Sequence, residues 1–176
     1  MNYDFDTARV RVVAFDLFGT VFDLKSAPAE EVRDYGRQIR LPEWQPLVLP
    51  RTWETMPAFP DSAEGLRLLR ERFFVSSLSN APLGLAAKMC KNAGVHFDCL
   101  LPLELGRVYK PNPLAYLKLC DVLACMPSEV LIVTANKDFG DIEAARSLGM
   151  QATLIRHPAA AFPTIVALAQ ALSGGV

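Results

Sequence analysis

Residues 10–20 read VRVVAFDLFGT, an apolar run that ends in Asp16 and continues into a turn at Gly19 and Thr20. The run is short, rich in valine and shows little alternation of polar and apolar residues. This pattern is typical of a strand that is buried on both faces. Four more runs of this kind follow along the chain, at Phe73–Leu78, Phe97–Leu101, Val130–Thr134 and Ala152–Ile155.

Helical patterns separate these runs. Apolar residues recur at helical spacing in five stretches, at Ser62–Arg72, Pro82–Ala93, Pro113–Ala124, Phe139–Leu148 and Phe162–Leu172. Strands that alternate with helices favour right-handed crossovers and a mostly parallel sheet with helices on both faces. The sequence therefore predicts an α/β fold with five parallel strands.

Composition and charge exclude several classes of protein. The chain has 176 residues with a net charge of −1, which offers no electrostatic footprint for nucleic acid or an anionic membrane. Its apolar runs are all far shorter than the roughly 20 residues that span a bilayer. The first ten residues carry two aspartates and no apolar run, which argues against a secretory signal. We expect a cytoplasmic protein without nucleic-acid or membrane partners.

The four cysteines, Cys90, Cys99, Cys120 and Cys125, form no CxxC pair and have no histidine at metal-binding spacing. We expect reduced thiols, not a zinc site.

Residues 24–58 interrupt the alternation. They contain several prolines, both tryptophans (Trp44 and Trp53) and one plausible helix, Pro28–Ile39. On that helix three arginines, Arg33, Arg37 and Arg40, lie roughly opposite an apolar side. The segment is too small to be a second domain, so we expect a single domain over residues 1–176 with a small insert at about 24–58.

Polar residues follow the strands where each one ends. They are Asp16 and Thr20, then Ser79 and Asn80, then Lys110 in a turn, and finally Asn136 and Asp141. Taken singly, each is explained by a turn, a helix cap or an exposed lysine. Taken together they point to a site, because ligands of open α/β sheets bind beyond the carboxyl ends of the strands.

This series of residues resembles the motifs of the haloacid dehalogenase (HAD) superfamily of hydrolases. The resemblance covers nearly the whole chain in the same order, and FDLFGTVFD and VYKPNPLAY are its most specific stretches. It implies a three-layer, Rossmann-like core with strand order 3-2-1-4-5. It also implies that Asp16 is a nucleophile that forms a covalent aspartyl ester, and that Lys110 steadies the negative charge around it.

The other site residues take their expected roles from the same resemblance. Ser79, followed by Asn80, is expected to bind the transferring or carboxylate group, and the hydroxyls of Thr20 and Ser79 to donate hydrogen bonds. Asn136 and Asp141 are the candidates for orienting the water that hydrolyses the ester. These roles agree with the chemistry, because a carboxylate is a weak nucleophile that needs positioning and a nearby cation.

Two positions depart from the phosphatase members of the superfamily. Phe18 stands where those members carry an Asp general acid, whose catalysis is typically worth about 10²–10⁴-fold. Asn136 replaces an Asp that normally binds Mg²⁺, and the loss of an anionic oxygen weakens a site for a hard cation. Mg²⁺ stays possible through Asp16, Asp141 and the backbone carbonyl of Phe18.

The dehalogenase branch is closer, with an aromatic residue at the place of Phe18 and Asn at the place of Asn136. A halide leaves without a proton, so this chemistry requires neither an acid nor a metal cofactor. The motif is mixed, however, because that branch has an Asp where this chain has Phe139. The spacing from Asn136 to Asp141 follows the phosphatase branch.

The insert at about 24–58 then corresponds to a truncated cap. Arg33, Arg37 or Arg40 is a candidate for a missing carboxylate-binding arginine, or the three form a solvated face. The tryptophans of the insert, expected to be exposed, or the apolar last helix are candidate surfaces for a homodimer.

Three functions remain open. They are a haloacid dehalogenase-like hydrolase acting on a small molecule, a Mg²⁺-dependent phosphatase, and a degenerate member that binds without turnover.

Overall fold

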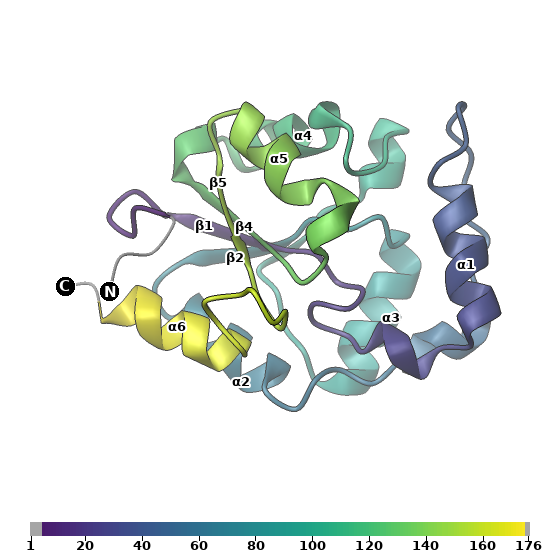
Figure 1. The fold of residues 1–176 in the computed structure, drawn as a ribbon, viewed down its shortest axis with the longest axis horizontal. Coiled ribbons are helices and arrows are strands. Elements are labelled where there is room, and N and C mark those ends of the chain that lie inside the picture. Colours follow the sequence, from purple (N-terminus) through teal and green to yellow (C-terminus); the bar gives the residue numbers. More distant parts are fainter. Residues whose placement is uncertain (1–4, 175–176) are drawn as a thin grey trace.

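A five-stranded parallel sheet forms the centre of the computed structural model, which describes residues 5–174 (Figure 1). The strands, in chain order, are β1 (Val12–Phe15), β2 (Phe74–Ser77), β3 (Cys99–Leu100), β4 (Val130–Thr134) and β5 (Gln151–Leu154). They are arranged as β3-β2-β1-β4-β5, which confirms the predicted order. The ends of the predicted domain, residues 1–4 and 175–176, lie outside the described residues.

Helices cover both faces of the sheet, as the apolar strands require. Val13 and Phe15 of β1 belong to one apolar core, and Val12 and Ala14 belong to the other. The first core is closed by α2 (Ser62–Arg70), α3 (Leu83–Ala93) and α6 (Ile165–Ser173). The second is closed by α4 (Pro113–Leu123) and α5 (Asp141–Ser147), which lie above the sheet in Figure 1. The three-layer architecture is therefore confirmed.

The register of the sheet brings the strand ends together. Phe15, the last residue of β1, pairs with Ser77 of β2 and with Val133 of β4. The polar residues that follow these three strands therefore emerge at one edge of the sheet, as strands of a parallel sheet require.

Most of the predicted elements are shorter in the structure, the edge strand and the last helix among them. The edge strand β3 has only two residues, and Phe97, which precedes it, packs its ring edge-on against Phe15 at a centroid distance of 6.4 Å. The last helix begins at Ile165 and not at Phe162, because the Thr164 side chain caps it by accepting a hydrogen bond from the Ala167 N–H at 3.0 Å.

The insert contributes one α-helix, α1 (Ala29–Gln38), which stands apart from the layered core in Figure 1. Two short 3-10 helices flank it, at Leu24–Ser26 and Arg51–Thr55. Trp53 of the second is 1% exposed and donates its indole N–H to Glu31 of α1 at 2.7 Å. The expectation that this tryptophan is exposed is wrong, because its ring fills the space between the insert and the core. Trp44 is half-buried and stacks on Tyr109.

Within residues 5–174, no helix is both long and apolar enough to cross a membrane. The four cysteines are free thiols, two of them buried.

A glycine sets how closely α2 approaches α6. A Cβ atom at Gly65 would lie 2.6 Å from Cγ2 of Ile165 and 2.9 Å from its carbonyl carbon. Gly65→Ala should lower the free energy of unfolding by about 1–3 kcal/mol, because backbone cannot yield as a flexible side chain does. Gly84→Ala in α3 is the matched control, since a methyl group added there would meet no atom within 4 Å. Chemical denaturation of both variants checks this, and equal stabilities would contradict it.

Candidate active site

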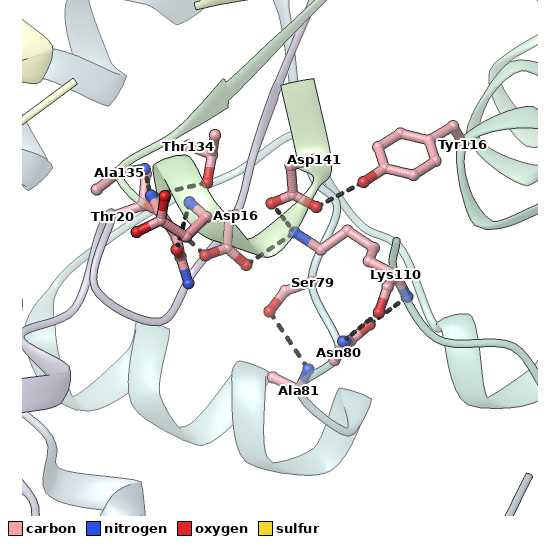
Figure 2. A network of polar contacts seen from close by, with 12 residues as sticks. Asp16, Thr20, Ser79, Asn80, Ala81, Lys110, Tyr116, Thr134, Ala135 and Asp141 are labelled. Carbon is pink, nitrogen blue, oxygen red and sulfur yellow. Dashed lines mark hydrogen bonds and ion pairs between the residues drawn. The ribbon is translucent and has the colours of Figure 1, made fainter. Parts of the chain in front are cut away.

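Asp16 directly follows β1 and lies at the centre of a polar network (Figure 2). Its backbone N–H donates to the carbonyl of Val133 at 3.0 Å, so pairing with β4 continues to this residue. Gly19, with a φ of +79°, makes the turn that returns Thr20 towards the carboxylate. The Thr20 hydroxyl lies 3.4 Å from Oδ2 of Asp16 and accepts the Ala135 N–H at 2.9 Å.

Lys110 bridges two carboxylates. Its Nζ lies 3.0 Å from Oδ1 of Asp16 and 3.0 Å from Oδ2 of Asp141. The side chains of Lys110 and Asp141 are 2% and 1% exposed, and that of Asp16 is 13% exposed. The other oxygen of Asp141 accepts the Tyr116 hydroxyl at 2.5 Å. Asp16 is thus the member of this chain of contacts that solvent or a ligand reaches.

Asn80 holds the backbone of Lys110. Its side-chain oxygen accepts the Lys110 N–H at 2.7 Å, and its amide donates to the Lys110 carbonyl at 3.1 Å. The hydroxyl of Ser79 accepts the Ala81 N–H at 3.3 Å, just before α3 (Figure 2). In this structure Asn80 therefore positions the lysine, whereas Ser79 supports the start of a helix.

The loop after β4 places Asn136 and Asp141. The Asn136 side chain accepts the Asp138 N–H at 3.2 Å and so holds the turn. Gly140, with a φ of +94°, follows and starts α5, so that Asp141 is its first residue and points at Lys110. A side chain at Gly140 would be strained, which ties the buried position of Asp141 to that glycine.

Burial and the close charges of Asp16, Lys110 and Asp141 shift the pKa values of Asp16 and Lys110. Burial raises the pKa of Asp16 above that of a free aspartate, although Lys110 opposes the shift. The negative charge of Asp141 raises it further. Burial by itself lowers the pKa of Lys110, but Asp141 and Asp16 outweigh it, so the pKa of the lysine is raised. The lysine is therefore a stable cation beside an aspartate that retains some tendency to be protonated.

A cavity of about 210 Å³ opens onto Asp16, which we call the Asp16 cavity. Lys110, Asn80 and Asn136 line it from the core, and Tyr35, Ile39 and Arg40 line it from the insert. Phe18 also lines it and is 5% exposed, with its ring edge-on to Tyr35 and Trp53 at centroid distances of 5.3 and 5.2 Å. The insert is thus a partial cover over the candidate nucleophile.

The three arginines of the insert have different surroundings. Arg40 lines the Asp16 cavity, and one of its N–H groups donates to the Gly36 carbonyl at 3.0 Å. Arg33 lines a neighbouring groove instead. Arg37 lines neither the cavity nor this groove; its side chain is exposed and pairs with Asp34 at 3.0 Å. Of the three, Arg40 is placed to meet a ligand at Asp16.

The donors at this site do not fit a magnesium ion. Lys110 occupies one oxygen each of Asp16 and Asp141, and Tyr116 occupies the second oxygen of Asp141. Over residues 5–174, no group of three or more His, Cys, Asp or Glu side chains is placed to hold a metal. A divalent ion at these carboxylates would compete with the ammonium group that already neutralises both of them.

Two residues of the site have no counterpart among the sequence predictions. Tyr116 lies on the buried face of α4, where a tyrosine looks like an ordinary core residue. Tyr35 lies on α1 of the insert and lines the Asp16 cavity. The only signal for Tyr116 was its place in the first two turns of the helix that follows the Lys110 loop.

No family model matches the chain. Among curated proteins it is similar to haloacetate dehalogenase H-2 of Moraxella sp. (strain B), with 27% identity over 151 residues. That match covers 83% of this chain and 66% of the relative. A match to (S)-2-haloacid dehalogenase 4A of Burkholderia cepacia is 36% identical over 88 residues, which is 48% of this chain and 38% of the relative. The chain thus spans less than two thirds of the length of these relatives.

Solved structures share the fold over most of its length. A defluorinating L-2-haloacid dehalogenase superposes with a TM-score of 0.73 and 26% identity, covering 93% of this chain and 95% of the other. The L-2-haloacid dehalogenase of Xanthobacter autotrophicus with chloropropionic acid covalently bound has a TM-score of 0.76 and 19% identity, covering 95% and 100%. Fold, motifs and relatives agree in one respect: this chain is similar to haloacid dehalogenases of the HAD superfamily.

The hydroxyl of Tyr116 should matter for folding. Tyr116→Phe removes the hydrogen bond to a buried, charged oxygen of Asp141, which should cost about 1–3 kcal/mol of unfolding free energy. Tyr109→Phe is the control, because its hydroxyl binds the Gln45 carbonyl at the surface and its loss should cost under about 1 kcal/mol. Urea denaturation measures both. A smaller loss for Tyr116→Phe than for the control would show that its hydrogen bond is unimportant.

Proposed function

We propose that this protein hydrolyses the carbon–halogen bond of a 2-haloacid through a covalent ester on Asp16. The observation that carries the proposal is the pairing of a cavity-facing Asp16 with the buried Lys110 at 3.0 Å, beside an aromatic residue at position 18. The relatives named above are dehalogenases of haloacetate and of 2-haloacids. One solved structure with this fold has chloropropionic acid covalently bound, which supports an ester intermediate.

The reaction has two steps. In the first, a carboxylate oxygen of Asp16 attacks C2 of the haloacid, a C–O bond forms, and the halide leaves with the electron pair of the C–halogen bond. In the second, water attacks the carbonyl carbon of the ester. The 2-hydroxyacid leaves, Asp16 returns to its carboxylate form and one proton is released.

Lys110 has a role in both steps. As a cation it keeps Asp16 ionised despite burial, and it neutralises the charge that develops on the ester carbonyl oxygen during hydrolysis. Thr20 holds the second oxygen of Asp16, which fixes the orientation of the carboxylate. Asn80 acts through Lys110 by holding its backbone, so it is a positioning residue.

Asn136 is assigned to the water that hydrolyses the ester, and Asp141 to the lysine. Both line the Asp16 cavity, and Asn136 is exposed enough to hydrogen-bond a water molecule at the ester. Asp141 is fully paired with Lys110 and Tyr116, so its part is to set the charge and position of the lysine. Ser79 contributes to the reaction least directly, because its hydroxyl accepts a backbone N–H at the start of α3.

The substrate carboxylate is assigned to Arg40. A guanidinium group makes two parallel hydrogen bonds to a carboxylate, and Arg40 lines the cavity with only one of its N–H groups engaged by Gly36. The cavity volume of about 210 Å³ suits a small acid.

Phe18 favours this chemistry over phosphate-ester hydrolysis. An alkoxide leaving group needs a proton, which phenylalanine cannot supply, whereas a halide leaves as a stable anion. The ring of Phe18 is packed between Tyr35 and Trp53, so it contributes an apolar wall. A haloacid carries a single negative charge. Lys110 therefore supplies enough positive charge at Asp16, and the reaction requires no metal cofactor.

The first prediction concerns halide release. The purified protein should release bromide from 2-bromopropionate in the presence of EDTA, and Asp16→Asn should reduce kcat/KM by about 10³-fold or more. Asp121→Asn, an exposed substitution on α4, is the matched control and should leave activity unchanged. Release that depends on Mg²⁺, or that survives in Asp16→Asn, would contradict the proposal.

The second prediction concerns pH. Attack requires the carboxylate form of Asp16, and burial raises the pKa of this group above that of a free aspartate, about 3.9. The value of kcat/KM should therefore fall as the pH drops through a point above about 3.9, and stay level on the alkaline side up to about pH 10 because the pKa of Lys110 is also raised. A profile of bromide release against pH measures this. An acid limb at or below the value of free aspartate would contradict the assignment.

A further inference from the structure

A second hollow adjoins the Asp16 cavity. It has a volume of about 890 Å³ and shares four lining residues with the cavity, which are Phe18, Leu24, Val32 and Asn136. We call it the side groove. Because the two hollows share part of their lining, the side groove lies directly beside the place where a ligand at Asp16 would bind.

The side groove combines an apolar floor with a charged rim. Phe18, Leu24, Val32 and Phe59 supply apolar surface along it. The rim carries three cations, Lys25, Arg33 and Lys137. In the part of the chain that the structure describes, none of these three side chains has a carboxylate within ion-pairing distance.

The other charged groups that line the side groove do not cancel the positive charge of these three cations. Arg156 is paired with Asp61 at 2.8 Å and also donates to the Thr20 carbonyl at 2.8 Å, so its guanidinium is already engaged. Two carboxylates line the groove, those of Asp23 and Asp138. The Asp23 side chain accepts the backbone N–H of Lys25 at 3.1 Å. The three cations of the rim therefore face two carboxylates, and an added anion would be attracted to the rim.

The helix α1 relates the side groove to the Asp16 cavity. Arg33 lines the side groove, and Arg40, just beyond the end of the helix, lines the cavity. The two lie seven positions apart, which at helical spacing is a rise of about 10 Å along the helix axis. A molecule with a carboxylate at each end of a short alkyl chain has a charged group for each arginine and apolar carbon for the surface of Phe18, Leu24 and Val32.

From these observations we infer that the preferred substrate is a 2-halo dicarboxylate, whose second carboxylate is bound in the side groove by Arg33 with Lys25 and Lys137 beside it. This inference rests on the proposed function at Asp16 and adds the class of substrate. The α-carboxylate binds at Arg40, the methylene chain crosses the floor near Phe18, and the terminal carboxylate reaches Arg33. The bonds made and broken at C2 are those of the two-step reaction above.

The test compares two substrates of equal carbon count, 2-bromoadipate and 2-bromohexanoate, which differ in the terminal carboxylate. The wild type should show a kcat/KM at least about fivefold higher for 2-bromoadipate, which is the gain that one partly exposed charge pair provides. Arg33→Gln should reduce this ratio to about one. Equal kcat/KM values for the two substrates in the wild type, with both of them turned over, would overturn the inference and leave the proposed function standing.

Arg37→Gln is the matched control. Arg37 lies on the same helix, carries the same charge, pairs with Asp34 and is not among the residues that line the two hollows. It should keep the wild-type ratio of the two kcat/KM values. A ratio that falls equally in Arg33→Gln and Arg37→Gln would show that net charge alone sets the preference, and would contradict a bound carboxylate at Arg33.

A binding measurement separates failure of the inference from failure of the proposed function. Adipate and hexanoate carry no halogen, so their dissociation constants, measured by titration calorimetry, do not depend on turnover. Adipate should bind the wild type at least about fivefold more tightly than hexanoate, and Arg33→Gln should abolish the difference. If neither bromo acid is turned over but this difference is present, the proposed function fails and the second carboxylate site holds. Equal dissociation constants for adipate and hexanoate overturn the inference whatever the activity.

Discussion

One buried ammonium group between two carboxylates is the interaction on which the rest of the site depends. Lys110 lies 3.0 Å from both Asp16 and Asp141, and almost none of its side chain is exposed. Removing one partner from such a buried arrangement typically costs about 3–5 kcal/mol, because the remaining charges lose their compensation. The arrangement is asymmetric, since Asp141 is closed off by Tyr116 while Asp16 faces the cavity. A stable cation and a reachable carboxylate are the two things that nucleophilic attack by an aspartate requires.

The fold supplies this arrangement from separate parts of the chain. The parallel register aligns the ends of β1, β2 and β4, so Asp16, Asn80 and the loop before Asp141 meet at one edge of the sheet. Asn80 then secures Lys110 through two hydrogen bonds to its backbone. The insert adds α1 over the opening, and its residues line both hollows. Under the proposed function, the residues at the strand ends carry out the reaction and the insert selects the substrate.

The sequence predicted the parallel sheet and the set of strand-end residues, because both depend on local patterns that parallel topology converts into proximity. The strand order was implied by the resemblance to the HAD superfamily. The sequence did not predict the pairing of Tyr116 with Asp141, since a tyrosine on a buried helix face is also an ordinary core residue. Nor did it distinguish Arg40 from Arg37, because the side of α1 that faces the cavity depends on how the insert packs. The burial of Trp53 was missed for the same reason.

The most direct test of the account is a single turnover of 2-bromopropionate in H₂¹⁸O with enzyme in excess. If Asp16 forms an ester and water attacks its carbonyl carbon, the first product hydroxyl comes from the aspartate. Mass spectrometry should then find ¹⁸O in the peptide that contains Asp16 and none in the 2-hydroxyacid. Label that appears at once in the 2-hydroxyacid, with none in that peptide, would mean that water attacks the substrate directly and that Asp16 is not the nucleophile.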